Sequence, residues 1–556
     1  MKKYSKWLLI LFISIVIIKV ILSQFVQTIS GFSDEYFYAK MARSFFVNME
    51  FTVHNVQVAQ YPPLYSILLS IAYIFKNMNY VYFFIKFINA ILSSLIIFPA
   101  WLLSKEFLEE KKAFITSLLI SILPSNFAFS PYIMAENLYY PLFLFAIYGI
   151  YKSTKPLNYK WPIITGIIAG LAYLTKISAL VIPTTFLITS LIIIFKSKRY
   201  FFEIKKFLVF IIPFLSLASL WSIRNGYLFG FSLSGILGSY SQSELSHGFV
   251  LDKLIIWIIL YLGYLLLSSL FIYTIFSLQL IKKKEYSNLL VISAITVILT
   301  IIMAANHNVG AISLNSFFLW LPGRPLGRYV DVLMPLIVIL GMIGLNQKEK
   351  ISKKWFFILS PIVIFSSLLM FFPLFPLNNL SLSWLGVLSV GVNYFVNNLL
   401  IQWILFTIFI SMLFLLIYKF TKLNPKKIVL GTIIFFMLLG FLNYAIISYN
   451  SKTYWANGDQ FKMGQFMNEF DPLPSNILLD SRYDATISKN DQTGIYQNLS
   501  SSYSSSIIGF WLNDNLFIGN PEELNKDIDY IYTKTNLNKK LIKRIGDFRI
   551  YSSKDL

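Results

Sequence analysis

Residues 7–36 read WLLILFISIVIIKVILSQFVQTISGFSDEY, and this stretch decides the fold. As far as Ile29 it is apolar except for Lys19 and a few small or amide side chains, and it is long enough to cross a bilayer as a helix. No small-x-small cleavage pattern follows, so we interpret it as a first transmembrane helix and not as a cleaved signal. Asp34 and Glu35 come directly after it. Two adjacent carboxylates are costly at such a place and indicate chemistry at the membrane surface.

The composition predicts that many such helices follow. The chain has 556 residues, of which 56% are hydrophobic and 13% are charged. A soluble protein carries roughly a quarter charged residues. Apolar runs of about twenty residues recur along the sequence, as in a polytopic helical membrane protein. The chain has no Cys, which excludes disulfides, thiol catalysis and thiolate metal sites.

The basic residues indicate topology and not nucleic-acid binding. The net charge is +21, but the lysines and arginines lie in short clusters between apolar runs, for example at 105–112, 282–284 and 348–354. This is the positive-inside pattern of membrane proteins, so no nucleic-acid partner is expected. The pattern places the N-terminus in the cytoplasm and predicts a multi-pass protein of the cell membrane.

The same clusters set the expected order of spans and loops. About thirteen transmembrane helices are predicted, at about 7–29, 80–103, 113–131, 137–151, 161–177, 179–195, 207–223, 251–280, 287–305, 329–346, 355–373, 398–418 and 427–448. The run 61–75 is short and has Pro62-Pro63 near its start, so it is expected to lie at the outer interface. The expected outer loops are 30–79, 132–136, 224–250, 306–328 and 374–397.

The composition changes at about residue 449. Acidic residues become frequent there, and the apolar runs shorten to strand length, as in 477–479 and 548–551. The sequence therefore predicts a transmembrane domain over 1–448 and a small α/β domain over 449–556 on the extracytoplasmic side, with the Ser-rich stretch 500–506 as a loop. A Gly-rich phosphate loop is absent from the sequence, which argues against an ATP-driven transporter.

Three acidic residues are the candidates for chemistry: Asp34, Glu35 and Glu136. They are expected on the same outer side, where they could deprotonate an acceptor hydroxyl or amide. They could also hold a divalent cation, Mg²⁺ or Mn²⁺, against a phosphate leaving group, with Asp34 and Glu136 as the ligands. Structural roles are equally open: Asp34 can cap a helix, and Glu136 is a favourable charge at a helix N-terminus. Residue type alone does not choose between these roles.

Other side chains on the outer side are candidates for substrate binding. Arg324, Arg328 and Lys176 could bind a phosphate, and the alternatives are interfacial snorkelling or, for Arg328, a salt bridge to Asp331. Tyr36 and Tyr61 could stack on a sugar, but packing is the simpler explanation for both. His54 could contact substrate or a metal, and the alternative is an exposed loop histidine.

The order of four motifs resembles the GT-C superfamily of membrane glycosyltransferases, in the branch of protein O-mannosyltransferases and lipid A aminoarabinose transferases. The motifs are Asp34-Glu35-Tyr36 with Ala39, Tyr61-Pro62-Pro63-Leu64-Tyr65, Pro131-Tyr132-Ile133-Met134-Ala135-Glu136-Asn137 and Gly170-Leu171-Ala172-Tyr173-Leu174-Thr175-Lys176. The resemblance covers about 1–200 and continues at Gly327-Arg328-Tyr329 and Leu333-Met334-Pro335.

This resemblance implies an inverting transfer of sugar from a polyprenyl-phosphate-linked donor to a protein, lipid or polysaccharide acceptor on the outer membrane face. It implies that Asp34 is the catalytic carboxylate, that Glu35 supports it, and that Glu136 holds the acidic position of the second outer loop. Gln60-Tyr61 stands where the aminoarabinose branch has Lys before Pro-Pro, which argues against that sugar. The Trp-Trp-Asp signature of oligosaccharyltransferases is absent from the sequence.

Two other functions remain open on the sequence. One is a transporter or flippase for polyprenyl-linked saccharides, which would place ionisable groups or broken helices near the bilayer midplane. Most acids here fall at the ends of the expected spans, which favours chemistry at the surface. The other is a scaffold with a degenerate site, and the intact Asp34-Glu35 pair argues against it.

Overall fold

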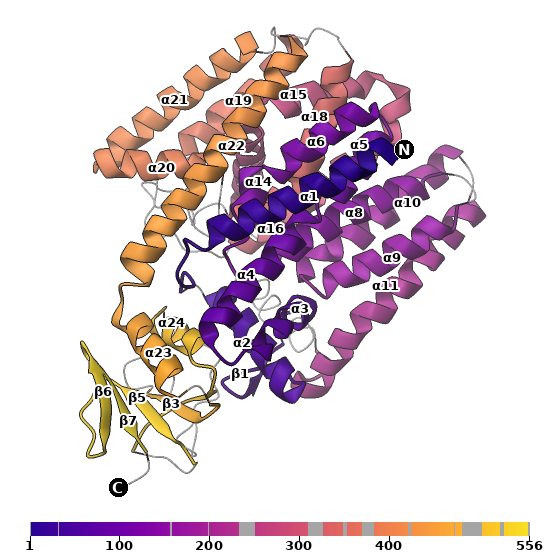
Figure 1. Ribbon diagram of the computed structural model, residues 1–556. Helices are drawn as coiled ribbons and strands as arrows, with labels where there is room; N and C mark the ends of the chain where they lie inside the picture. The colour runs from indigo at the N-terminus through magenta and orange to yellow at the C-terminus, as the bar shows by residue number, and fades with distance from the viewer. Residues whose placement is uncertain are drawn as a thin grey trace. The chain divides into compact units, whose positions relative to one another are not determined.

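The computed structural model is mainly helical, with one small sheet near the C-terminus (Figure 1). It describes residues 2–31, 33–59, 61–155, 158–197, 200–232, 251–309, 326–347, 353–369, 383–420, 424–471, 473–480, 503–522 and 527–553. The contacts divide the chain into two compact units. The first consists of 1–19, 91–129 and 136–445, and the second of 20–90, 130–135 and 446–556.

The first unit is a helical bundle. Its α-helices are α5 (Ile97–Lys105), α6 (Glu110–Ser121), α7 (Pro124–Phe127), α8 (Glu136–Ser153), α9 (Lys160–Tyr173), α10 (Val181–Ser197), α11 (Tyr200–Phe229), α14 (Leu251–Ser268), α15 (Ile272–Leu278), α16 (Ser287–Val309), α17 (Gly327–Val330), α18 (Met334–Asn346), α19 (Lys353–Leu369), α20 (Trp384–Phe395) and α21 (Leu399–Phe420). Most of α1 (Lys2–Ser23) and of α22 (Pro425–Asn450) also belongs to this unit. Short 3₁₀ turns join several of them, among them η2 (Ile177–Leu180), η3 (Gln279–Lys282), η4 (Lys284–Tyr286) and η5 (Asp331–Leu333).

Glycines bring two pairs of these helices into close contact. A Cβ atom at Gly344 of α18 would lie 2.0 Å from the carbonyl oxygen of Phe276 in α15. A Cβ atom at Gly166 of α9 would lie 2.2 Å from the carbonyl oxygen of Phe210 in α11. Lipid tails are as apolar as the helix surfaces, so the hydrophobic effect does not drive helices together within a membrane. Close backbone approach at small residues instead stabilises the helix pair through van der Waals contacts. A larger residue at either glycine would push its helix pair apart.

Eight helices of the described residues are long and apolar enough to cross a membrane. They are Tyr4–Ser23, Met78–Lys105, Ile177–Lys196, Tyr200–Phe229, Leu251–Ser268, Lys284–Val309, Gly327–Asn346 and Pro425–Trp455. Shorter apolar helices are found at Leu64–Ile74, Ile272–Lys282, Lys354–Val363, Trp384–Phe395 and Leu400–Leu416. The chain is therefore a multi-pass membrane protein. The predicted total of about thirteen spans is not established by these helices and stays a prediction.

Three expected boundaries are wrong. The span expected at 113–131 ends at Ser121, and a new short helix begins at Pro124, since proline fits the first turn of a helix but not its interior. The span expected at 251–280 breaks after Ser268, because Leu270 and Phe271 take positive φ angles of 54° and 57°. The expected outer loop 374–397 contains the helix α20.

The second unit combines the segment after α1 with the C-terminal region. Its N-terminal part holds α2 (Ser33–Asn48), the hairpin β1 (Thr52–Val53) and β2 (Val56–Gln57), the short helix α3 (Leu64–Ser70) with η1 (Ile71–Ile74), and most of α4 (Met78–Ser94). His54 and Asn55 form the hairpin turn with φ angles of 52° and 61°. Two successive positive φ angles are typical of the tight turns that join antiparallel strands.

The C-terminal part of this unit is α/β, as the shortened apolar runs predict. The π-helix η7 (Ser451–Trp455) and α23 (Asp459–Phe470) lead into β3 (Asn476–Asp480), α24 (Tyr503–Trp511), β4 (Asn515–Gly519), β5 (Tyr530–Thr533), β6 (Leu541–Ile545) and β7 (Phe548–Ser552). The strand order is β4-β3-β5-β7-β6, in which β3 runs parallel to β4 and β5, and β7 runs antiparallel to β5 and β6. The core of the sheet contains Leu478, Phe517, Ile528, Ile531 and Tyr551.

The expectation of a loop over 500–506 is wrong for its second half. Residues 503–506 form the first turns of α24, while 500–502 lie outside the described residues. The serines suggest a loop, but Ile507, Ile508 and Trp511 further along are buried. Tertiary packing of that apolar side therefore outweighs the weak helix preference of serine.

Candidate active site

Asp34 and Glu35 occupy the first turn of α2, but their surroundings differ. Glu35 is completely buried and accepts hydrogen bonds from the backbone N–H of Ser30 at 3.2 Å and of Ile133 at 3.1 Å. The Ser30 hydroxyl also donates to the same carboxylate. Burial raises the pKa of Glu35 to about 7, and these hydrogen bonds oppose the rise. Glu35 thus ties the start of α2 to the segment 130–135.

Asp34 is only partly buried, and an aromatic residue orients it. The Tyr61 hydroxyl donates a hydrogen bond of 2.8 Å to the Asp34 Oδ1. The ring of Tyr61 stacks on Phe37 at 5.2 Å between centroids and meets the ring of Tyr38 at 5.1 Å in an edge contact. Packing therefore accounts for the ring of Tyr61, and its hydroxyl is placed to hold the carboxylate of Asp34.

Tyr36 and His54 form a buried pair. The Tyr36 hydroxyl and His54 Nε2 are 2.7 Å apart, and the two rings lie 5.5 Å apart. Both residues are buried, so the alternative of an exposed loop histidine at position 54 is wrong. The pair joins α2 to the turn of the β1–β2 hairpin. Burial raises the pKa of the Tyr36 hydroxyl well above its usual value.

The far end of α2 is fixed to the C-terminal part of the same unit. Lys40 Nζ donates to the carbonyl oxygen of Leu512 at 2.6 Å. The Arg43 guanidinium donates to the side chains of Asn513 at 3.0 Å and Asn515 at 3.2 Å. Burial raises the pKa of the neighbouring Asp514 to about 6 and lowers the pKa of Lys40. The helix that carries Asp34 is therefore held at both ends.

The first unit brings together three other candidates from the sequence: Glu136, Lys176 and Arg328. Lys176 follows α9 and forms a buried ion pair with Glu136, which lies in the first turn of α8. Arg328 in α17 places its Nε 3.9 Å from the same Glu136 oxygen. These side chains are 7%, 2% and 11% exposed for Lys176, Glu136 and Arg328. Lys176 is thus buried in a charged cluster and does not snorkel.

Aromatic residues contact this charged cluster, and the sequence analysis assigned them no role in the site. The Tyr140 hydroxyl donates to the Arg328 carbonyl at 3.0 Å, and Lys176 Nζ lies 4.9 Å from the ring centre of Tyr329. Asp331, which follows Arg328 closely in the sequence, is also buried. It accepts a hydrogen bond of 3.0 Å from the Tyr264 hydroxyl. A usable signal was present, because Tyr140 lies one helical turn after Glu136 and Tyr329 adjoins Arg328.

The cluster has the chemistry of an anion site. It combines the Glu136 carboxylate with two cations, and the buried Asp331 carboxyl group lies close enough to interact electrostatically with Glu136. Arg and Lys are the residues that bind phosphate, Arg through a planar fork and Lys as a point charge.

The predicted metal site and some of the predicted outer-loop residues are not found in the described structure. In the described part of the chain, no group of three or more His, Asp or Glu side chains could hold a metal ion. Arg324 lies outside the described residues, as do 233–250, 310–325 and 370–382 of the expected outer loops. Asp34 with Glu35 belongs to the second unit and Glu136 to the first.

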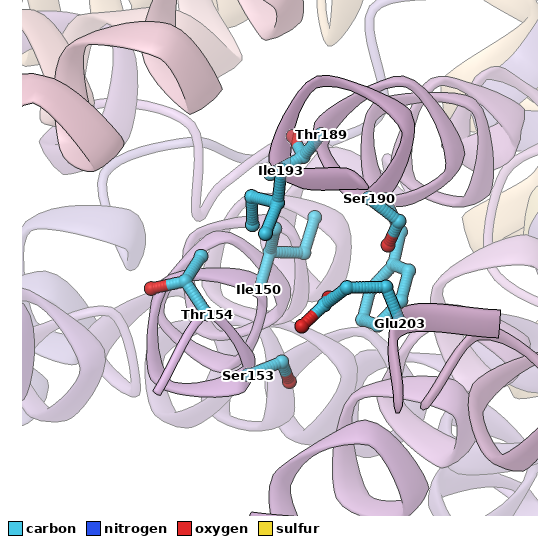
Figure 2. Close-up of a pocket in the computed structure, with 8 residues that line it drawn as sticks. Ile150, Ser153, Thr154, Thr189, Ser190, Ile193 and Glu203 are labelled. Atoms are coloured by element: carbon cyan, nitrogen blue, oxygen red, sulfur yellow. The ribbon is translucent and has the colours of Figure 1, made fainter. Parts of the chain in front are cut away.

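A separate polar pocket lies between α8, α10 and α11 of the first unit (Figure 2). Figure 2 shows the Glu203 side chain reaching toward Ser153 and Thr154. The volume of the pocket is about 10 Å³, which is the space of one water molecule. Glu203 is also paired with Lys206 at 2.8 Å. This pocket therefore cannot hold a sugar or a lipid headgroup.

Comparisons with known proteins agree with this architecture. The family model described as dolichyl-phosphate-mannose-protein mannosyltransferase matches residues 60–223. The crystal structure of ArnT from Cupriavidus metallidurans bound to undecaprenyl phosphate matches with a TM-score of 0.57 and 14% identity, covering 99% of this chain and 98% of that one. The apo state of the same protein matches with a TM-score of 0.54, 13% identity and the same coverage. No curated protein sequence matches the chain.

The fold is that of the GT-C membrane glycosyltransferases. Residues 60–223 thus match a mannosyltransferase family model, and the chain shares its fold with ArnT, so the chain is similar to membrane glycosyltransferases of the GT-C type, which includes ArnT and the protein mannosyltransferases. The resemblance seen in the order of its sequence motifs is confirmed.

Proposed function

We propose that this protein transfers a sugar, with inversion, from a polyprenyl-phosphate-linked donor to a protein, lipid or polysaccharide acceptor on the extracytoplasmic face of the cell membrane. The observation that carries the proposal is the Glu136–Lys176–Arg328 cluster, a buried site that holds two cations. The match to the mannosyltransferase family model over 60–223 supports it. The shared fold with ArnT, which has been crystallised with undecaprenyl phosphate, also supports it.

In this proposal Lys176 and Arg328 bind the phosphate of the donor. When the bond between the anomeric carbon and the phosphate oxygen breaks, the electron pair stays on that oxygen and its negative charge grows. Fixed cations stabilise charge that develops in a transition state. Glu136 is a positioning residue, because it holds both cations in place and offsets part of the cost of burying them before the donor binds.

Asp34 is the proposed general base. The acceptor oxygen or nitrogen attacks the anomeric carbon opposite the phosphate, its proton passes to the Asp34 carboxylate, and polyprenyl phosphate leaves. Attack opposite the leaving group inverts the anomeric centre. Tyr61 orients the carboxylate through its hydrogen bond. Glu35 is enclosed by protein, so its proposed role is to position the first turn of α2.

The activity test uses the purified full chain with polyprenyl-phosphate sugars and measures release of free polyprenyl phosphate. Asp34→Asn is expected to abolish release while the protein elutes as a single species. Glu50→Gln is the matched control, because Glu50 is an exposed carboxylate shortly after the same helix. Full activity in the Asp34→Asn variant would overturn the assignment. A flippase would move the donor without breaking its bond to the sugar, so release of free lipid phosphate separates the two functions.

The topology is part of the proposal. The N-terminus is cytoplasmic and the region 449–556 is an extracytoplasmic domain. The chain has no Cys, so single cysteines can report the side of the membrane. Leu541→Cys in β6, where the side chain is 49% exposed, should react with an impermeant thiol reagent in intact cells. Lys111→Cys should react only after lysis. The reverse pattern would refute the orientation.

A further inference from the structure

A second cavity of the first unit lies between α6, α18 and the start of α22. Its volume is about 290 Å³, close to the lower limit for ligand sites in proteins. Ile115 of α6, Met342 of α18, and Val429 and Ile433 of α22 form apolar walls. Glu136, Lys176 and Arg328 do not line it. The cavity is thus distinct from the charged cluster and suits a hydrocarbon chain.

Part of the lining of this cavity is polar and basic. Lys112, Asn346 and Lys426 form this part. Lys112 Nζ donates to Asn346 Oδ1 at 2.5 Å and lies 3.8 Å from Glu109, whose side chain is 78% exposed. An ammonium has three donors, so Asn346 leaves Lys112 able to bind an anion. Lys426 is exposed in the first turn of α22, where the helix dipole disfavours a cation and favours an anion.

We propose that this cavity binds one phospholipid with an anionic headgroup. An acyl chain lies between the three helices, and the headgroup phosphate contacts Lys112 and Lys426. Two observations select this occupant. The apolar walls disfavour a soluble phosphate compound, and the two lysines in the lining prefer a net negative headgroup to a zwitterionic one. Basic pockets between transmembrane helices are known to take anionic lipid headgroups. The positive-inside pattern explains why lysines are on this side but not why two of them border a cavity.

The lipid would connect parts of the bundle that are far apart in the sequence. Lys112 and Asn346 already join α6 to α18. A phosphate between Lys112 and Lys426 adds the first turn of α22, which continues toward the C-terminal region. The inference concerns a lipid ligand of the bundle and does not depend on the proposed sugar transfer.

The test is native mass spectrometry of the full chain titrated with phosphatidylglycerol and with phosphatidylcholine of the same acyl chains. Wild-type protein is expected to bind phosphatidylglycerol at least about tenfold more tightly. Each lysine near a lipid phosphate contributes roughly 1 kcal/mol, so Lys112→Gln with Lys426→Gln should weaken phosphatidylglycerol binding roughly thirtyfold. Equal binding of the two lipids by the wild-type protein would overturn the proposal.

The matched control is Lys111→Gln with Lys427→Gln. Lys111 and Lys427 are exposed neighbours on the same two helices and do not line the cavity. This control should retain phosphatidylglycerol binding within about twofold, and equal losses in the two double variants would refute a specific site.

Two further measurements complete the test. Leu430→Trp, at a lining residue that is 59% exposed, tests the chain-binding part without removing a charge and should lower the affinity for both lipids. Stronger displacement of phosphatidylglycerol by undecaprenyl phosphate than by phosphatidylglycerol itself would assign the cavity to the donor lipid and refute the proposal.

Discussion

The Glu136–Lys176–Arg328 cluster and the first turn of α2 stabilise their carboxylates by opposite means. Glu136 is buried against two cations. Asp34 and Glu35 are held by neutral donors: a tyrosine hydroxyl for Asp34, and a serine hydroxyl with two backbone N–H groups for Glu35. The two cations offset the negative charge of Glu136, whereas the neutral donors of α2 bring no positive charge to Asp34 and Glu35. The comparison suggests that the cluster serves an anion and that α2 supplies a base.

Removing a cation from the cluster is expected to have the largest effect on activity. Lys176→Met should lower kcat/KM for the donor by roughly 10²- to 10³-fold, as does loss of one donor to a developing anion in other enzymes. Arg328→Lys keeps the charge but loses the planar fork, so its loss should be smaller than that of Arg328→Met. Arg224→Met serves as a control, because Arg224 in α11 stacks on Trp221 at 4.3 Å and does not belong to the cluster. Wild-type activity in Lys176→Met would contradict the phosphate role.

The pH dependence of stability tests the surroundings of Glu35 in the first turn of α2. Burial raises the pKa of Glu35 from 4.5 to about 7, so between these values the folded protein holds a proton that the unfolded chain has lost. The free energy of unfolding should therefore fall as pH rises from about 4.5 to 7, by about 3 kcal/mol in total from this group.

This pH effect can be measured by thermal unfolding at pH 5 and pH 8. In Glu35→Gln, whose side chain stays neutral, the difference in Tm between the two values should shrink. An unchanged difference would show that Glu35 is not the group responsible. Glu50→Gln, at an exposed carboxylate, provides the control.

The smallest effect concerns the tyrosine that orients Asp34. Tyr61→Phe removes one hydroxyl and leaves the ring packed on Phe37. A hydrogen bond to a charged group contributes about 1.5–3 kcal/mol, and a water molecule can replace part of it in a partly exposed site. We expect kcat to fall about tenfold with little change in Tm. Tyr80→Phe, at an exposed tyrosine of α4, should have no effect. A loss in Tyr61→Phe that appears only as lower thermal stability would indicate a packing role.

The sequence predicted the residues of the site better than their partners. Asp34, Glu35, Glu136, Lys176 and Arg328 all stood out because charged groups at helix ends are costly in a membrane protein. The pairing of Glu136 with Lys176 was not predictable, because the two residues are 40 positions apart and on different helices. For the same reason the sequence left interfacial snorkelling open as an alternative for Lys176.

The sequence predicted most of the fold but not its irregular parts. Apolar runs predicted most helices, because hydropathy reports burial in lipid directly. The break between α14 and α15 has no Gly or Pro to mark it, and only tertiary packing keeps Leu270 and Phe271 at positive φ. The short helix α24 was missed because its serines resemble a loop, although its apolar residues pack against the second unit's core.

The hydrogen bonds from α2 to the C-terminal region also affect the order in which the newly made chain can fold. Lys40 and its partner Leu512 are 472 residues apart in the chain. At ribosomal rates of 5–20 residues per second, roughly 25 to 95 seconds separate the synthesis of these two residues. The helix that carries Asp34 is thus among the first parts to be made and among the last to be fixed. A nascent chain should therefore lack a fixed α2 until residues 512–515 have been made, and the proposed activity should appear only after that point.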